Sequence, residues 1–131
     1  MIVVDTSALL AVLLDEPEKA RFRDFLAEAP RKMVSAVNVL EAGIVMSTRR
    51  GPDGLAALAD LIDRAEIEVV PFDHAQSQLA LAAFQAFGKG RHAARLNICD
   101  CAAYALAKGM NVPLLYKGND FAATDITAAL V

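Results

Sequence analysis

MIVVDTSALL, at residues 1–10, places one carboxylate in an otherwise apolar run that continues to Leu14. The segment of residues 1–4 is short and rich in β-branched side chains, which predicts a strand buried on both faces of a sheet. Residues 8–14 form an apolar helix that Thr6 or Ser7 can cap with a side-chain oxygen. Asp5 therefore follows the first strand, at the edge where open α/β sheets bind ligands. A carboxylate there needs a cation or several donors, and helix capping is an equally open role for it.

Length and composition predict a single domain over residues 1–131 and no membrane span. Hydrophobic residues make up 56 % of the chain and charged residues 22 %, but no apolar stretch reaches the ~18 residues that cross a bilayer. The start has neither a basic n-region nor a small-residue cleavage site, so we expect a cytoplasmic protein. Because the net charge is −3, any contact with nucleic acid has to be local.

The two cysteines predict reduced thiols rather than a disulfide or a zinc site. Cys99 and Cys101 lie two residues apart in a predicted helix, so their side chains diverge by roughly 200° and cannot bridge each other. Two thiols alone do not make a zinc site.

Short strands alternate with helices along the whole chain. Strands are predicted at residues 1–4, 32–35, 67–71 and 112–116. Helices are predicted at residues 8–14, 17–29, 36–50, 52–65, 74–87 and 96–109, and a short capped turn or strand at 124–127. This alternation predicts an α/β fold with a mainly parallel central sheet and helices on both faces.

Glu41 is the second acidic residue in an apolar setting. It falls within the helical pattern that predicts one buried face, which comprises Val37, Leu40, Glu41, Ile44, Val45 and Thr48. A buried glutamate needs a raised pKa or a compensating partner. A glutamate at the edge of the stripe that reaches solvent is the alternative.

A basic segment interrupts the pattern between the last two long helices. Residues 88–95 contain two glycines and the densest positive charge in the chain, from Lys89, Arg91 and Arg95 together with His92. A solvated linker and a mobile loop that binds anions are both compatible with this composition.

Four acids are predicted to reach the same edge of the sheet. Asp5 and Asp120 directly follow strands, while Glu41 and Asp100 lie early in helices. Converging carboxylates repel one another by kilocalories unless divalent cations lie between them, and oxygen ligands alone select Mg²⁺ or Mn²⁺ over zinc. Metal-assisted hydrolysis of a phosphodiester is the chemistry that suits this arrangement.

Several stretches, taken in order over nearly the whole chain, resemble a PIN domain and most closely the VapC-type toxins. They are Asp5-Thr6-Ser7-Ala8, Glu41, Gly88-Lys89-Gly90-Arg91-His92, Leu96-Asn97-Ile98-Cys99-Asp100, Ala103-Tyr104-Ala105-Leu106-Ala107, Lys117-Gly118-Asn119-Asp120-Phe121 and Thr124-Asp125-Ile126. The resemblance implies a three-layer PIN-like fold and an endoribonuclease that depends on Mg²⁺ or Mn²⁺. It also implies a homodimer that a cognate antitoxin inhibits by covering or entering the acidic site.

The resemblance also assigns site residues. Asp5, Glu41 and Asp100 match the core acids of the family, and the fourth acid is either Asp120, which we favour, or a position that aligns with Asn119. Asp5 and Asp100 are expected to hold the main metal ion, and Glu41 and Asp120 to ligate directly or through water. The number of metal ions in the site is either one or two. Ser7 is expected to add a hydrogen bond.

Two other functions fit parts of the pattern. A phosphotransferase with an aspartyl nucleophile also places an aspartate after the first strand, but it is expected to carry a second acid where Ser7 stands. A catalytically silent PIN-like module would use the acids as an anionic patch for a basic partner.

Overall fold

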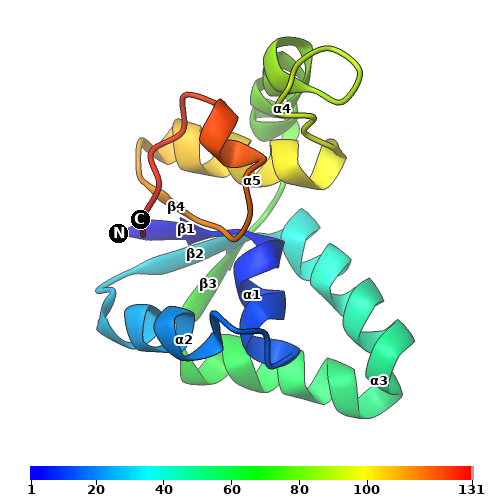
Figure 1. The fold of residues 1–131 in the computed structure, drawn as a ribbon, viewed down its shortest axis with the longest axis vertical. Coiled ribbons are helices and arrows are strands. Elements are labelled where there is room, and N and C mark those ends of the chain that lie inside the picture. The colour runs from blue at the N-terminus through cyan, green and yellow to red at the C-terminus, as the bar shows by residue number, and fades with distance from the viewer. Residues whose placement is uncertain (131) are drawn as a thin grey trace.

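The strands form one parallel sheet in a computed structural model that describes residues 1–130 (Figure 1). They are β1 (Ile2–Val4), β2 (Lys32–Ser35), β3 (Ile67–Val70) and β4 (Leu114–Leu115). The order is β3-β2-β1-β4, and Val3 pairs with Met33 on one side and with Leu114 on the other. β1 is therefore central and fully buried, as its apolar sequence predicts.

Helices cover both faces of this sheet, which confirms the predicted three-layer α/β fold. They are α1 (Thr6–Leu13), α2 (Lys19–Glu28), α3 (Ala36–Arg64), α4 (His74–Phe87), α5 (Ile98–Met110) and the short 3₁₀ helix η1 (Phe121–Ala123). One buried cluster joins α1, α2 and α3 to the sheet, and a second joins α4 and α5 to the opposite face (Figure 1). Among the described residues, no helix is long and apolar enough to span a bilayer.

Several helix ends differ from the sequence prediction by one or two residues. α1 begins at Thr6 because Asp5 itself is the N-cap, so neither Thr6 nor Ser7 caps the helix. α2 starts two residues after Pro17. α5 continues past Gly109 and ends where Asn111 adopts a left-handed conformation with φ 55°, which asparagine tolerates better than most residues.

The two helices predicted at residues 36–50 and 52–65 form one element, α3, with a kink between them. Gly51 has φ 59° and ψ −144° at that point. Glycine is suited to this conformation because it has no Cβ to clash. The following Pro52 lacks the N–H that a continuous helix would need.

The predicted buried face of residues 37–48 is wrong. Leu40 is 63 % and Ile44 58 % exposed, whereas the side chains that face the core are Asn38, Ala42 and Met46. In this first half of α3, Asn38, Ala42 and Met46 therefore face the core, and the predicted core residues Leu40 and Ile44 face solvent. Periodicity alone cannot separate these two faces, because both repeat every three to four residues.

The C-terminal tail pairs weakly with β4. Leu114 forms an isolated parallel bridge with Ala128, and the Leu114 N–H donates to the Thr127 carbonyl across 2.9 Å. The predicted short turn or strand at residues 124–127 corresponds to this irregular segment.

Candidate functional site

Asp5 lies buried at the carboxyl end of the central strand, with 3 % of its surface exposed. Its backbone N–H donates to the Leu115 carbonyl across 2.9 Å, which ties the residue to the end of β4. Its Oδ2 accepts from the Ser7 N–H at 3.0 Å and from the Ser7 hydroxyl at 2.6 Å. Its Oδ1 is buried and has no hydrogen-bond partner among the described residues, so this oxygen lacks a donor or cation that would compensate its charge.

The surroundings of Asp5 favour its protonated form. Burial is the main cause that raises the pKa of Asp5 from 3.8 to about 7, and the charges of Asp100 and Glu41 raise it further. The two hydrogen bonds from Ser7 act in the opposite direction. A buried carboxylate with acidic neighbours and an unpartnered oxygen is a group that a cation would stabilise.

Asp100 belongs to the first turn of α5, where it has a structural role as well. The Asp100 N–H donates to Asn97 Oδ1 at 2.8 Å, and Asp100 Oδ2 accepts from the Asn97 N–H at 3.0 Å. This reciprocal capping box stabilises the start of the helix. Burial raises the pKa of Asp100, the bond from Asn97 lowers it, and the charges of Asp120 and Glu41 raise it.

Glu41 and Asp120 complete this group of interacting acids. Glu41 is half-buried in α3, and its charge acts on both Asp5 and Asp100. Asp120 is exposed in the loop after β4, and its charge acts on Asp100. The fold therefore brings all four predicted acids into one electrostatic neighbourhood from four separate segments. Asn119 lies beside Asp120 and is exposed as well.

Cys99 is adjacent to the acids and is held as a thiol. Burial, the charge of Glu41 and a hydrogen bond to Glu41 raise the pKa of Cys99 to about 12. Both cysteines are free, in agreement with the sequence prediction. At neutral pH Cys99 is thus a weak donor to the Glu41 carboxylate and not a thiolate nucleophile.

Lys117 supports the site in a way that its sequence position does not reveal. Its backbone N–H donates to Ser7 Oγ at 2.9 Å, the same oxygen that bonds Asp5. Its side chain pairs with Glu16 at 3.3 Å and with Glu18 at 3.0 Å. The loop after β4 is therefore tied both to the α1–α2 connection and to the hydroxyl that orients Asp5.

The donor set fits a hard divalent cation. All four side chains offer carboxylate oxygens, and the buried Oδ1 of Asp5 has no other partner in the described chain. Within residues 1–130, no three His, Cys, Asp or Glu side chains are arranged as a finished metal-binding set. The acids thus interact electrostatically and offer suitable ligand oxygens, but they are not already arranged as a coordination shell.

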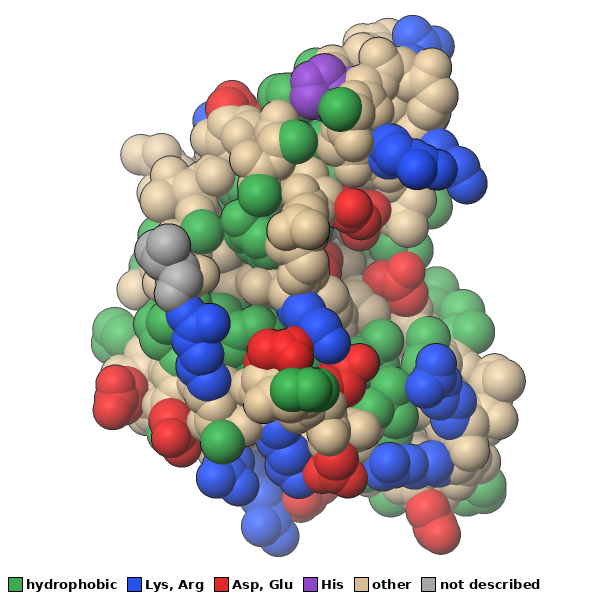
Figure 2. All heavy atoms as spheres, in the orientation of Figure 1, with side chains coloured by type: hydrophobic (Ala, Val, Ile, Leu, Met, Phe, Trp, Pro, Cys, Tyr) green, Lys and Arg blue, Asp and Glu red, His purple; other side chains and the backbone are tan. Residues whose placement is uncertain are grey.

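Basic residues lie beside the acids. On the right-hand side of Figure 2 the surface is hollowed between the part formed by α4 and α5 and the part formed by α3, with acidic groups inside and basic groups above and below. In the loop before α5, Lys89, Arg91 and Arg95 are exposed. None of the three forms an ion pair with an acid of residues 1–130.

Internal contacts organise this basic loop. Gly88 bridges to Leu96 at its two ends. Arg91 lies 5.7 Å from the centre of the Phe84 ring. His92 accepts the Ala94 N–H through Nδ1 at 3.0 Å and packs edge-on against Phe87. His92 therefore shapes the loop, while Lys89, Arg91 and Arg95 stay exposed, with Arg91 also in contact with the Phe84 ring.

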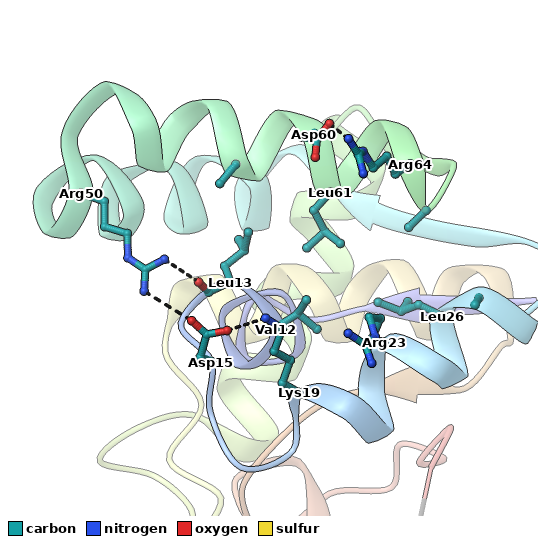
Figure 3. A pocket seen from close by; sticks show the side chains of 13 residues that line it. Val12, Leu13, Asp15, Lys19, Arg23, Leu26, Arg50, Asp60, Leu61 and Arg64 are labelled. Carbon is teal, nitrogen blue, oxygen red and sulfur yellow. Dashed lines mark hydrogen bonds and ion pairs between the residues drawn. The ribbon is translucent and has the colours of Figure 1, made fainter.

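A second concavity lies away from the acids, between α1, α2 and the second half of α3 (Figure 3). Its volume is about 450 Å³, and its floor includes Leu13, Leu26 and Leu61. Its rim cations have acidic partners, which are Asp15 for Lys19 and Arg50, Asp24 for Arg23 and Asp60 for Arg64. This groove is therefore not a free cationic surface, in contrast to the basic loop.

Comparisons with known proteins agree with this architecture. The family model described as PIN domain matches residues 2–126. Ribonuclease VapC28 of Mycobacterium tuberculosis is 46 % identical over 129 residues, which cover 98 % of this chain and 97 % of that protein. The crystal structure of VapC20 from Mycobacterium tuberculosis, described as a sarcin-ricin loop cleaving toxin, has a TM-score of 0.82 at 18 % identity, with both chains covered completely. A toxin-antitoxin complex from Klebsiella pneumoniae has a TM-score of 0.71 at 14 % identity, again with complete coverage of both chains. The chain therefore belongs to the PIN domain family and, within it, to the VapC proteins.

Proposed function

We propose that this protein is a Mg²⁺-dependent endoribonuclease and the toxin of a toxin-antitoxin pair. The observation that carries the proposal is the buried Asp5, whose Oδ1 has no partner among the described residues and whose carboxylate interacts with Asp100 and Glu41. Such a group is stable in its ionised form when a cation binds beside it. The names of its VapC relatives, which are ribonucleases, support RNA as the substrate.

The four acids have different roles at the site. Asp5 and Asp100 hold the main metal ion, and Glu41 and Asp120 ligate it directly or through water. When bound, Mg²⁺ supplies positive charge that polarises a phosphoryl oxygen, lowers the pKa of water and stabilises the leaving oxygen. Glu41 and Asp120 also accept hydrogen bonds from the attacking water and so orient it. Mn²⁺ is expected to substitute, because it favours the same oxygen ligands.

The basic loop binds the RNA backbone. An acidic site repels a polyanion, so cations at its border are needed to attract the substrate. Lys89, Arg91 and Arg95 meet this need because they are exposed and unpaired with acids of the described chain. His92 contributes mainly by fixing the loop conformation through Ala94.

Two protein partners complete the proposal. A cognate antitoxin inhibits the enzyme by covering or entering the acidic site, as the toxin-antitoxin complexes among the structural neighbours lead us to expect. A second copy of the chain covers part of the aliphatic surface that α3, α4 and α5 expose. This part comprises Leu40, Leu81 and Ile98, which line one cavity, and Ile44, one helical turn from Leu40. Side chains of this size gathered on one surface are typical of an interaction site.

Incubation with RNA tests the activity. Purified protein, free of antitoxin, is added to total cellular RNA with Mg²⁺ or with EDTA, and new RNA ends are mapped by sequencing. The proposal predicts discrete new ends only with Mg²⁺. Intact RNA in both samples would support a silent interaction module, and a phosphoryl group trapped on Asp5 would support a phosphotransferase.

A further inference from the structure

Asn38 is a fully buried polar residue in the first turn of α3, with an exposed fraction of 0 %. Its Nδ2 donates to Thr6 Oγ1 at 3.0 Å and to the Cys99 carbonyl at 3.1 Å. The Thr6 hydroxyl in turn donates to the Asn38 carbonyl at 3.3 Å. One amide thus connects α1, α3 and α5, which are far apart in the sequence.

Each residue in this network is close in sequence to one of the acids. Thr6 follows Asp5, Cys99 precedes Asp100, and Asn38 lies three residues before Glu41 on the same helix. A shift of any of these elements by a fraction of an ångström would therefore move one carboxylate relative to the other two. The Asn38 side chain, on α3, forms hydrogen bonds to both α1 and α5.

We propose that Asn38 is a positioning residue that fixes the three elements carrying Asp5, Glu41 and Asp100, and thereby sets the metal affinity of the site. This inference rests on the proposed function and deepens it. Burying an amide in a core contributes little net stability compared with apolar packing, so a geometric role accounts better for its presence. Residues that support metal ligands from behind typically change metal affinity by about 10- to 100-fold when they are replaced.

Thr6 is the second member of the same network. Its hydroxyl accepts from the Asn38 side chain and donates to the Asn38 backbone. Loss of the Asn38 side chain therefore removes one of these two hydrogen bonds between α1 and α3, and loss of the Thr6 hydroxyl removes both. Substitutions at the two positions should therefore be non-additive. Thr6→Ser keeps the hydroxyl and should behave as the wild type, whereas Thr6→Val removes it at similar size.

The experiment measures Mn²⁺ binding by calorimetry and thermal stability for the same set of proteins. The set comprises the wild type, Asn38→Ala, Asn38→Val, Thr6→Val, Thr6→Ser and the double variant Thr6→Val with Asn38→Ala. Leu58→Ala is the matched control, because Leu58 is buried in the second half of α3 and has no polar side-chain atom that could join this network. Exchange of the Ser7 and Asp100 amide hydrogens is measured in EDTA as a readout that needs no metal.

The inference predicts that the Asn38 variants weaken Mn²⁺ binding about 10- to 100-fold and that the double variant loses less binding free energy than the sum of the two single variants. Leu58→Ala should lose stability but keep its Mn²⁺ affinity. Folded Asn38 variants with wild-type Mn²⁺ affinity would overturn the inference. Should both fail to fold, loss of affinity in Thr6→Val but not in Thr6→Ser supports it, and no loss in either overturns it.

The amide exchange separates this inference from the proposed function. If the wild type binds no Mn²⁺, the proposed metal-dependent function is wrong. The exchange rates of the Ser7 and Asp100 amide hydrogens then show whether Asn38 holds the elements in place. Faster exchange at both Ser7 and Asp100 in the Asn38 variants than in Leu58→Ala supports the connection between the elements. Equal exchange in these variants overturns it.

Discussion

The Ser7 hydroxyl donates to Asp5 Oδ2 across 2.6 Å and accepts the Lys117 N–H through the same oxygen. These contacts hold the carboxylate in one orientation and favour its ionised form, against the effect of burial. Burial dominates, so the pKa of Asp5 is raised to about 7. The site therefore keeps an oriented acid that becomes fully ionised when a cation compensates its charge.

Asp5 should make the metal-free protein less stable as the pH rises. Its pKa is near 3.8 unfolded and about 7 folded, so the folded state binds more protons between these values and loses stability over that window. We expect Asp5→Asn, which can still accept the Ser7 N–H, to remove this loss. In EDTA, the variant should gain on the wild type by on the order of 4 kcal/mol between pH 4 and pH 8.

Chemical unfolding of both proteins at several pH values in EDTA checks this prediction. A difference in unfolding free energy that is the same at pH 4 and pH 8 would mean that Asp5 ionises without cost in the fold.

Asp100→Asn should abolish RNA cleavage and leave the metal-free protein at least as stable as the wild type. Burial and the neighbouring acids raise the pKa of Asp100, so removal of its charge relieves a cost. An asparagine at this position can still accept the Asn97 N–H, and the capping box is not lost completely. With excess Mg²⁺ the advantage should shrink or reverse, because the wild type gains binding free energy.

Thermal melts of both proteins in EDTA and in Mg²⁺ measure this difference. A lower melting temperature for Asp100→Asn in EDTA would assign the residue mainly to helix capping.

Removal of two cations from the basic loop should weaken RNA binding in a salt-dependent way. The double variant Arg91→Ala, Arg95→Ala is expected to reduce the slope of log K against log salt by roughly 1.4, since each phosphate contact to single-stranded RNA contributes about 0.7. Binding is measured in EDTA, where the RNA stays intact. Mn²⁺ affinity should not change.

A matched control is the double variant Arg23→Ala, Arg64→Ala, in the groove whose cations have acidic partners (Figure 3). It should keep the wild-type slope. Equal slopes for all three proteins would assign residues 88–95 to a solvated linker.

The aliphatic surface near the site should mediate self-association. Ile98 is 77 % exposed and Leu40 63 %, so Leu40→Ser with Ile98→Ser removes apolar surface at little cost to the fold. Light scattering should give twice the 14.0 kDa chain mass for the wild type and a monomer for the variant. Val69→Ser, on β3, is the control that should stay dimeric, and a monomeric wild type would contradict the prediction.

The sequence predicts the strands and the layers well, because these features depend on local pattern. Residues 1–4 are buried as a strand, and α4 has the predicted bounds of residues 74–87. The buried face of α3 could not be predicted, because Leu40 and Ile44 have the periodicity of a core and are exposed.

The supporting contacts of the site depend on tertiary structure. Asn38 meets Cys99 across 61 positions, and Lys117 meets Ser7 across 110, so no local pattern identifies these pairs. For the first pair, the sequence contains one indication, which is a polar residue at position 38 within an otherwise apolar helical segment. For Lys117, the sequence contains no comparable sign.

The most direct test of the central claim, that the acids form a metal site that cleaves RNA, is the cleavage rate of a defined RNA by three proteins. These are the wild type, Asp100→Asn and the control Asp63→Asn, which changes an exposed acid of α3, each in Mg²⁺ and in EDTA. We predict cleavage by the wild type and by Asp63→Asn in Mg²⁺ only, and none by Asp100→Asn in either buffer. Cleavage by Asp100→Asn at the wild-type rate, or equal cleavage by the wild type in EDTA, would contradict the claim.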